Sequence, residues 1–192
     1  ETVTIVYQGE VEHRDSAGNQ GRVGPGDVQW MTAASGVVHD EFHGRELTRS
    51  GGHLEMAQLW VNLPAAKKMS PPRYQEIPAS AIPTVSLEDG AGEARIIAGE
   101  FQEIAGPAKT FTPINLWDLR LAAGKSLRIP LPDGFTTMLV VQQGDVRIND
   151  SLPFIEASQE LNPQSPDHVA GRAVVLGHII GIGFGQPGAK MQ

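Results

Sequence analysis

Cysteine is absent from this chain of 192 residues, which excludes disulfides and thiolate metal sites. Any bound metal must therefore be held by histidine and carboxylate side chains. Long hydrophobic runs are also missing, since no apolar segment approaches the roughly 18 residues of a membrane-spanning helix. Basic residues are outnumbered, with 15 Lys and Arg against 22 Asp and Glu and a net charge of -7, so the charge does not support direct nucleic-acid binding. We expect a cytoplasmic protein without a membrane or direct nucleic-acid partner.

Strong helical patterns are scarce, whereas Gly and Pro are frequent and spread along the chain, at 22 and 14 residues. Between them lie short runs rich in Val, Ile, Leu and Thr, a pattern typical of an all-β sandwich or barrel. The strands predicted in the first part of the chain cover residues 2–7, 10–14, 20–23, 28–31, 36–41 and 54–63. The polar and charged stretch 42–52 is predicted to be a surface loop.

The composition changes at residues 64–83, where several prolines break regular structure. This stretch is the best candidate for a linker between two domains. A second set of strands is predicted after it, at residues 93–99, 114–122, 137–142 and 145–148. The sequence therefore predicts two small β-barrels in tandem.

The most informative short motif is His39-Asp40-Glu41, which follows an apolar pair. In a strand, His39 and Glu41 point to the same face and Asp40 to the other, because side chains alternate with period two. A nitrogen donor and an oxygen donor on one face suit non-haem iron or manganese. The spacing alone leaves metal binding open, since His-x-Glu is common by chance.

Five other residues are weaker candidates for the same region. His13 is predicted to be a half-exposed residue of a polar strand. His43 and Glu46 fall in the predicted loop after residue 41, where they are either solvated or at the rim of a cavity. Trp30 and Trp60 are predicted to pack in the core, with the lining of a cavity as the alternative.

Several longer motifs, in a consistent order, resemble the pirin family. They are ETVT at 1–4, GEVEHRDS at 9–16, PGDVQWMTA at 25–33, GVVHDE at 36–41, QLWVNLP at 58–64 and MSPPRYQ at 69–75. The resemblance covers roughly residues 1–177 and is strongest in the first 78. Pirins are bicupins, so the resemblance implies two tandem cupin β-barrels. We expect an N-terminal barrel with the metal site at residues 1–78 and a C-terminal barrel without one at residues 79–192.

In pirins, one metal in the N-terminal barrel is bound by three histidines and one glutamate. His39 and Glu41 match two of these ligands, and two further histidines are expected upstream of Glu1, outside this sequence. The resemblance thus implies a chain truncated at its N-terminus and altered or truncated at its C-terminus. It implies iron(II) as the metal, with Mn, Ni, Cu or Zn as alternatives. No second metal site is expected, because the only histidines of the second barrel are His168 and His178.

The resemblance implies two alternative functions. The first is a dioxygenase of the quercetin 2,3-dioxygenase type, which opens flavonols with O₂; here His39 would fix the metal, and Glu41 would be both a ligand and the catalytic base. The second is a metal- or redox-sensing regulatory protein that binds transcription factors or metabolic enzymes without catalysis. The expected partners are a small aromatic substrate or a protein, and the chain is expected to be a monomer or a dimer. Activity is expected of the full-length parent, whereas the truncated chain could be inactive.

Overall fold

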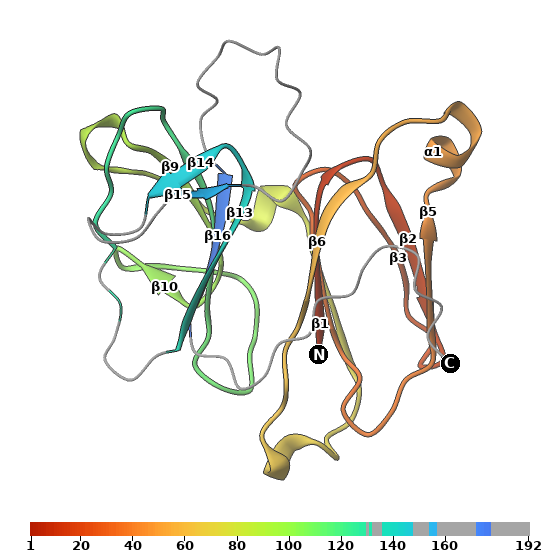
Figure 1. Ribbon diagram of the computed structural model, residues 1–192. Coiled ribbons are helices and arrows are strands. Elements are labelled where there is room, and N and C mark those ends of the chain that lie inside the picture. Colours follow the sequence, from red (N-terminus) through yellow and green to blue (C-terminus); the bar gives the residue numbers. More distant parts are fainter. Residues whose placement is uncertain (130, 132–135, 148–153, 157–171, 178–192) are drawn as a thin grey trace. The chain divides into compact units, whose positions relative to one another are not determined.

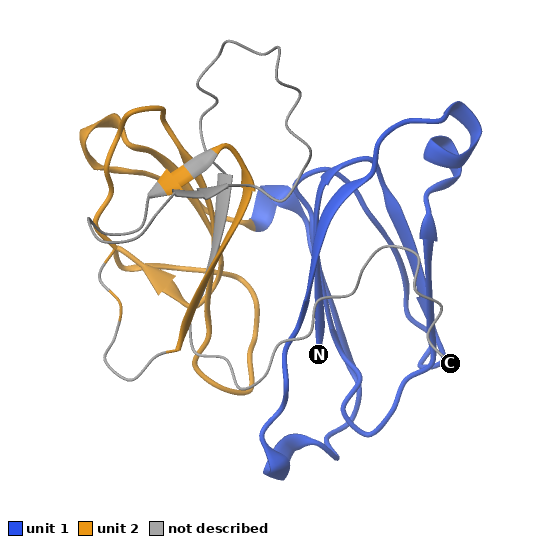
Figure 2. Cartoon of the chain, viewed as in Figure 1, with its two compact units in different colours: residues 1–81, 179–192 blue, residues 82–178 orange. Residues whose placement is uncertain are grey.

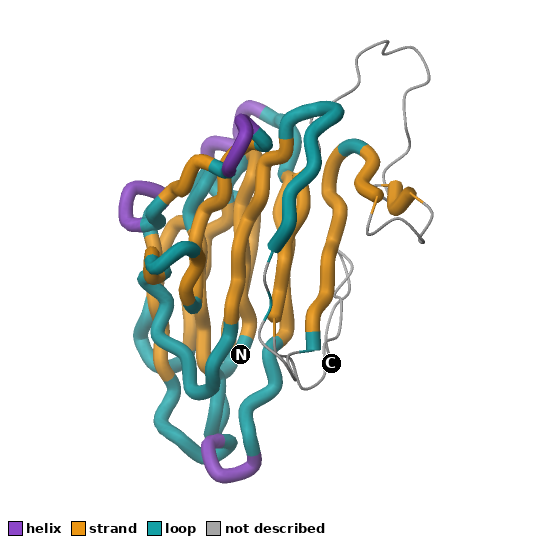
Figure 3. The backbone as a smooth tube through the Cα atoms, turned by 90° about the vertical axis from the view of Figure 1, so that its left-hand side faces the viewer, coloured by secondary structure: helices purple, strands orange, loops and turns teal. Residues whose placement is uncertain are grey.

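The structure is a computed structural model that describes residues 1–129, 131, 136–147, 154–156 and 172–177. Strands make up most of its regular structure (Figures 1 and 3), which confirms the prediction of an all-β chain. The chain divides into two compact units, unit 1 within residues 1–81 and unit 2 within residues 82–178 (Figure 2). Among the described residues, no helix is long and apolar enough to cross a membrane.

Unit 1 is built from two antiparallel sheets that face each other (Figure 1). Sheet A has the strand order β6-β1-β4-β7, and sheet B has the order β3-β2-β5. The strands are β1 (Thr2–Gln8), β2 (Val11–Asp15), β3 (Gln20–Val23), β4 (Val28–Thr32), β5 (His39–His43), β6 (Glu55–Trp60) and β7 (Arg73–Ile77).

Strand β1 of sheet A has buried side chains on both faces of the sheet, Val3 and Ile5 on one face and Thr4 on the other. Val3 and Ile5 of β1 are fully buried, and so is Thr4 between them. Thr4 lies opposite Gln29 of β4 on one side and opposite Gln58 of β6 on the other. Because paired residues on neighbouring strands share a face of the sheet, these three polar side chains form one row across sheet A.

The prediction of a surface loop at residues 42–52 is wrong in two respects. Strand β5 continues to His43, and a short helix, α1 (Arg45–Ser50), follows it. No residue of this helix is fully buried. Its Glu46 and Arg49 side chains form an ion pair of 2.6 Å across one turn. A helix without a buried face shows no hydrophobic periodicity, which is why the sequence pattern did not indicate it.

The predicted linker at residues 64–83 contains regular structure as well. Strand β7 pairs with β4 along its whole length, with Gln75 opposite Trp30. The prolines lie outside the strand, with Pro72 just before it and Pro78 just after it. A strand on the edge of a sheet accepts such neighbours, because proline at its ends removes no ladder hydrogen bond.

Unit 2 is organised around a five-stranded antiparallel sheet of order β13-β16-β12-β9-β8, with the two-stranded ladders β10-β11 and β14-β15. Its strands are β8 (Thr84–Ser86), β9 (Gly92–Ala98), β10 (Glu100–Phe101), β11 (Ile104–Ala105), β12 (Asn115–Leu121), β13 (Thr137–Gln143), β14 (Asp145–Arg147), β15 (Phe154–Glu156) and β16 (Arg172–Gly177). Four of these, β9, β12, β13 and β14, confirm predicted strands to within one residue at each end.

The core of unit 2 combines apolar packing with one buried ion pair. Ile96, Trp117 and Leu119 belong to its buried cluster. Arg95 of β9 and Asp118 of β12 lie opposite each other and form an ion pair of 3.0 Å. The described residues also include three short 3₁₀ helices, η1 (Ala65–Lys67), η2 (Ala79–Ala81) and η3 (Glu88–Gly90).

Candidate metal centre

Strand β5 places His39 and Glu41 on one face, as the period-two alternation predicts. Both side chains are half-buried, and their donor atoms lie within 4.8 Å of each other and of a third donor. Asp40 between them is exposed and binds Arg14 of β2, with its Oδ2 atom 2.8 Å from the Arg14 Nη2 atom. The alternation of β5 therefore separates a pair of candidate ligands from a surface ion pair.

The third donor is His13, which the sequence analysis misplaced. The prediction of a half-exposed residue is wrong, because His13 is only 2% exposed. Its strand, β2, is the central strand of sheet B and pairs with β5, which sets His13 opposite Glu41. The signal was present in the sequence, since Val11 and His13 share one face of β2 and Val11 is also buried.

The three donors of this centre lie close together. The Nδ1 atom of His13 lies 3.9 Å from the Oε1 atom of Glu41. The imidazole rings of His13 and His39 have centroids 5.5 Å apart. Two imidazoles and one carboxylate are a common ligand set for non-haem iron, and they also suit other first-row metals.

One observation speaks directly for a metal at this position. Within the part of the chain that the structure describes, the buried Nδ1 atom of His39 has no hydrogen-bond partner. Buried polar atoms are usually satisfied, and this one belongs to a residue that offers a ligand atom within 4.8 Å of those of His13 and Glu41. A divalent cation would provide a partner, and the residues present thus fit the metal that the donor set implies.

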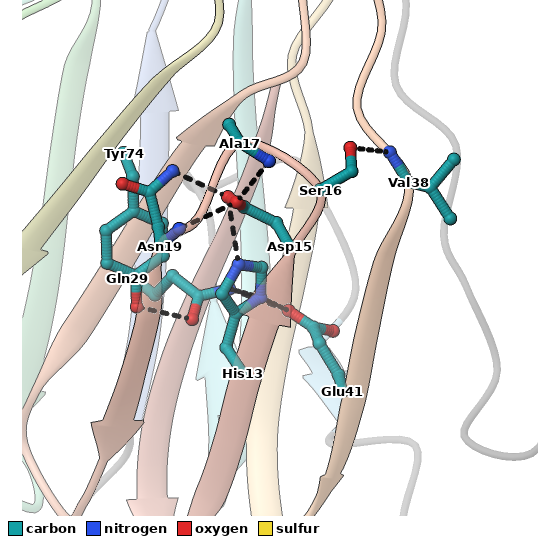
Figure 4. Close-up of polar contacts among 9 residues, drawn as sticks. All are labelled: His13, Asp15, Ser16, Ala17, Asn19, Gln29, Val38, Glu41 and Tyr74. Carbon is teal, nitrogen blue, oxygen red and sulfur yellow. Dashed lines mark hydrogen bonds and ion pairs between the residues drawn. The ribbon is translucent and has the colours of Figure 1, made fainter.

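Asp15 orients the ring of His13 (Figure 4). Its Oδ2 atom lies 3.5 Å from the Nε2 atom of His13, and Asn19 and Ala17 donate hydrogen bonds to the same carboxylate. Burial of Asp15 raises its pKa, but the hydrogen bonds from Asn19, His13 and Ala17 outweigh it, so the pKa lies below the ordinary value. An ionised Asp15 accepts a hydrogen bond from the Nε2–H group of His13, which leaves the Nδ1 lone pair of His13 facing Glu41 and the Nε2 atom of Gln29, 3.4 Å away.

Two glutamines of sheet A reach across to the carboxylate of Glu41. The Nε2 atom of Gln29 donates to Oε1 at 2.7 Å, and the Nε2 atom of Gln58 donates to Oε2 at 2.7 Å. Tyr74 of β7 donates its hydroxyl proton to the Oε1 atom of Gln29 at 3.0 Å and stacks on the ring of His13, with centroids 4.9 Å apart. Glu41 is therefore held from both sheets.

The hydroxyl of Tyr74 remains a donor over a wide pH range. Burial, together with the negative charges of Glu76, Glu41 and Asp15, raises the pKa of Tyr74 to about 12. The phenol therefore stays protonated well above neutral pH, and the hydrogen bond to Gln29 persists with it.

None of the other candidate residues that the structure describes is among the three donors of this centre. His43 and Glu46 are exposed, at the end of β5 and on α1. Trp30 is fully buried as predicted, whereas Trp60 is 37% exposed, so the prediction of core packing is wrong for Trp60. His168 and His178, the histidines considered for the second barrel, lie outside the described residues.

A histidine- and glutamate-lined interior between two antiparallel sheets is the arrangement of a cupin-type metalloprotein, and comparisons with known proteins agree. The sequence profile of the pirin family matches residues 1–61. A protein of Pseudomonas aeruginosa, named provisionally as a quercetin 2,3-dioxygenase, is 56% identical over 79% of this chain and 53% of its own length. The pirin of Homo sapiens is 37% identical over 85% of this chain and 53% of its own length.

Solved structures give the same result. The chain superposes on a quercetin 2,3-dioxygenase of Acinetobacter baumannii with a TM-score of 0.83 and 43% identity, over 93% of this chain and 64% of that one. A protein of Geobacillus kaustophilus gives a TM-score of 0.77 at 29% identity, over 93% of this chain and 74% of that one. A bacterial pirin of Escherichia coli, crystallised with nickel(II), shares the fold at a TM-score of 0.59 and 19% identity, over 93% of this chain and 72% of that one.

The chain belongs to the pirin family, and its fold is the bicupin fold of that family. It spans about half the length of the curated relatives that it matches, with shares of 53%, 50% and 56% for three of them.

Proposed function

We propose that the protein binds one divalent metal ion in unit 1 through His13, His39 and Glu41, and that the whole protein acts as a dioxygenase on flavonols such as quercetin. The observation that carries the proposal is the convergence of these three donors, whose ligand atoms all lie within 4.8 Å of one another. Iron(II) is the first choice of metal, because two imidazoles with one carboxylate suit it.

The chain's own residues have distinct tasks in this proposal. His39 would bring a ring nitrogen to the metal, and His13 would bring the Nδ1 atom that its contact with Asp15 through Nε2 leaves unprotonated. The side chain of Glu41 keeps 17% of its surface exposed, so a substrate hydroxyl could approach the carboxylate and transfer its proton to it. A bound metal would supply a Lewis-acid site for the deprotonated hydroxyl oxygen.

The substrate class is supported by the names of relatives. Proteins of Pseudomonas aeruginosa at 56% identity and of Acinetobacter baumannii at 43% identity carry the name quercetin 2,3-dioxygenase, provisionally in the first case. In that reaction O₂ adds to the flavonol, both oxygen atoms enter the ring-opened organic product, and one ring carbon leaves as carbon monoxide. Since this chain spans about half of such relatives, the activity is proposed for the whole protein.

The test is aerobic turnover of quercetin by the full-length, iron-loaded protein, followed by loss of flavonol absorbance and release of carbon monoxide. The variant Glu41→Gln removes the proton acceptor, and Asp40→Asn is its matched control because Asp40 points to the other face of β5. We expect turnover in the unaltered protein and in the control, and a loss of at least about 100-fold in Glu41→Gln.

Metal analysis of the same samples separates the two functions that the family resemblance implies. A stoichiometric metal content without turnover of any flavonol would refute the dioxygenase and favour the regulatory alternative. An equal loss of turnover in the Asp40→Asn control and in Glu41→Gln would contradict the proposed role of Glu41, because the effect would not be specific to the face of β5 that carries His39 and Glu41.

A further inference from the structure

The carboxylate of Glu41 accepts hydrogen bonds from two neutral amides of the opposite sheet. These two residues, Gln29 and Gln58, are called the clamp below. Each oxygen atom of the carboxylate accepts one hydrogen bond with an N···O distance of 2.7 Å, Oε1 from Gln29 and Oε2 from Gln58. Rotation of the carboxylate about its last bond would break both hydrogen bonds together. The plane of the group is therefore fixed, while each oxygen keeps a further lone pair for another partner.

The two amides are placed by the register of sheet A. Gln29 lies on β4 and Gln58 on β6, and both are opposite Thr4 of the strand between them. The Nε2 atom of Gln58 also donates to the Oγ1 atom of Thr4 at 3.2 Å. The row thus presents two amide donors, one on each side of Thr4, and each donates to a different oxygen of the same carboxylate.

Tyr74 determines which way the amide of Gln29 points. Its hydroxyl donates to the Oε1 atom of Gln29 at 3.0 Å, so the amide oxygen faces Tyr74 and the amide nitrogen faces Glu41. An amide turned the other way would set an oxygen against the carboxylate and would lose both hydrogen bonds.

The neutrality of these donors matters for what Glu41 can bind. A Lys or Arg in their place would offset the negative charge of the carboxylate and compete with a cation. Amides orient the carboxylate and leave its charge available to a divalent metal. Resting on the metal site proposed above, we propose that Gln29 and Gln58 are positioning residues that fix Glu41 as a metal ligand, with Tyr74 setting the orientation of Gln29.

The experiment measures the affinity of the 192-residue chain for Mn²⁺ and Ni²⁺ by isothermal titration calorimetry. Gln58→Met and Gln29→Met remove one donor each and keep an unbranched side chain of similar length. Gln20→Met is the matched control, because Gln20 is exposed on β3, the strand of sheet B on the far side of β2 from Glu41. We expect each clamp variant to lose about 10- to 100-fold in metal affinity and the control to stay within about twofold.

Two further measurements separate positioning from folding. The thermal midpoint of the metal-free chain reports on structure, and in Gln58→Met, where the side chain is only half-buried, we expect it to stay near that of the unaltered chain. Tyr74→Phe keeps the stacking on His13 but loses the hydroxyl, and we expect a smaller loss of affinity than in Gln29→Met.

The outcomes distinguish the two proposals. If the unaltered chain and both clamp variants bind the metal with equal affinity, the positioning role is overturned and the metal site remains supported. The same loss in Gln20→Met as in Gln58→Met would also overturn it, because the effect would not be specific to the clamp. A chain that binds neither Mn²⁺ nor Ni²⁺ would overturn the metal site and the clamp together.

Discussion

Replacing Asp15 by asparagine tests how the imidazole of His13 is oriented. The Oδ1 atom of Asp15 accepts the backbone N–H groups of Ala17 and Asn19, each at 2.9 Å. Its Oδ2 atom accepts the side-chain amide of Asn19 at 2.8 Å and lies 3.5 Å from the Nε2 atom of His13. In Asp15→Asn, the two backbone donors hold the remaining oxygen, so the new NH₂ group faces the two other donors.

The magnitude follows from the contacts that are lost. One hydrogen bond from Asn19 to a charged acceptor is worth about 1.5–3 kcal/mol, and the longer contact to His13 adds less. The remaining conflict between two donors is relieved when the proton of His13 moves from Nε2 to Nδ1, the atom that faces Glu41. We expect the free energy of unfolding to fall by about 2 kcal/mol, and the affinity for a divalent metal to fall by about 10- to 100-fold.

Three measurements check this prediction. Nitrogen-15 NMR of the His13 ring identifies the tautomer, chemical denaturation gives the free energy of unfolding, and calorimetry gives the affinity for Mn²⁺. Asp40→Asn is the control, because it removes an exposed carboxylate that forms an ion pair with Arg14 on the surface. A variant that keeps the proton on Nε2 and binds Mn²⁺ as tightly as the unaltered chain would refute the reasoning.

Three other perturbations have expected outcomes. The pKa of Asp15 is lower in the folded chain than its ordinary value of 3.8, so its contribution to stability is present above pH 3.8 and is lost as the pH falls through the lower folded value. Denaturation curves at several pH values should show this loss, and Asp15→Asn should remove it. Folding raises the pKa of Tyr74 from 10.0 to about 12, so its contribution to stability is present below pH 10 and is lost as the pH rises toward 12. A phenolate absorbance titration should show a transition near this pH that Tyr74→Phe abolishes. Arg95→Met removes the ion pair of the buried Asp118 carboxylate with Arg95 and should lower the free energy of unfolding by about 3–5 kcal/mol. The double variant Arg95→Met/Asp118→Leu should recover most of this loss. Equal losses in the single and double variants, measured by chemical denaturation, would contradict this account.

The sequence predicted those parts of the fold that have a periodic signal. Strands β1 to β6 of unit 1 and β9, β12, β13 and β14 of unit 2 were predicted, because apolar and β-branched runs alternate there with glycine and proline; β8, β10, β11, β15 and β16 were not predicted. The shared face of His39 and Glu41 followed from the same alternation. Helix α1 escaped because none of its residues is buried, and β7 escaped because the prolines that flank it read as a linker.

The third donor was missed for a different physical reason. His13 stands among Glu12, Arg14 and Asp15, and a run of charged residues normally indicates a solvated strand. Its burial comes from the pairing of β2 with strands on both sides and from the ring of Tyr74, which is 61 positions away in the sequence. Such contacts depend on the register of distant strands, and the local alternation of β2 indicates only that His13 shares a face with Val11.

The same register explains why polar residues occupy the interior of unit 1. Thr4 is fully buried between Val3 and Ile5, and a buried threonine in an apolar strand would otherwise be a cost without a benefit. Its position opposite Gln29 and Gln58 turns it into the centre of a row that faces Glu41. A slip of β1 by one residue would replace this row with apolar side chains and leave the carboxylate without donors. The apolar residues of β1 therefore do more than fill a core, because their alternation fixes the register on which the metal centre depends.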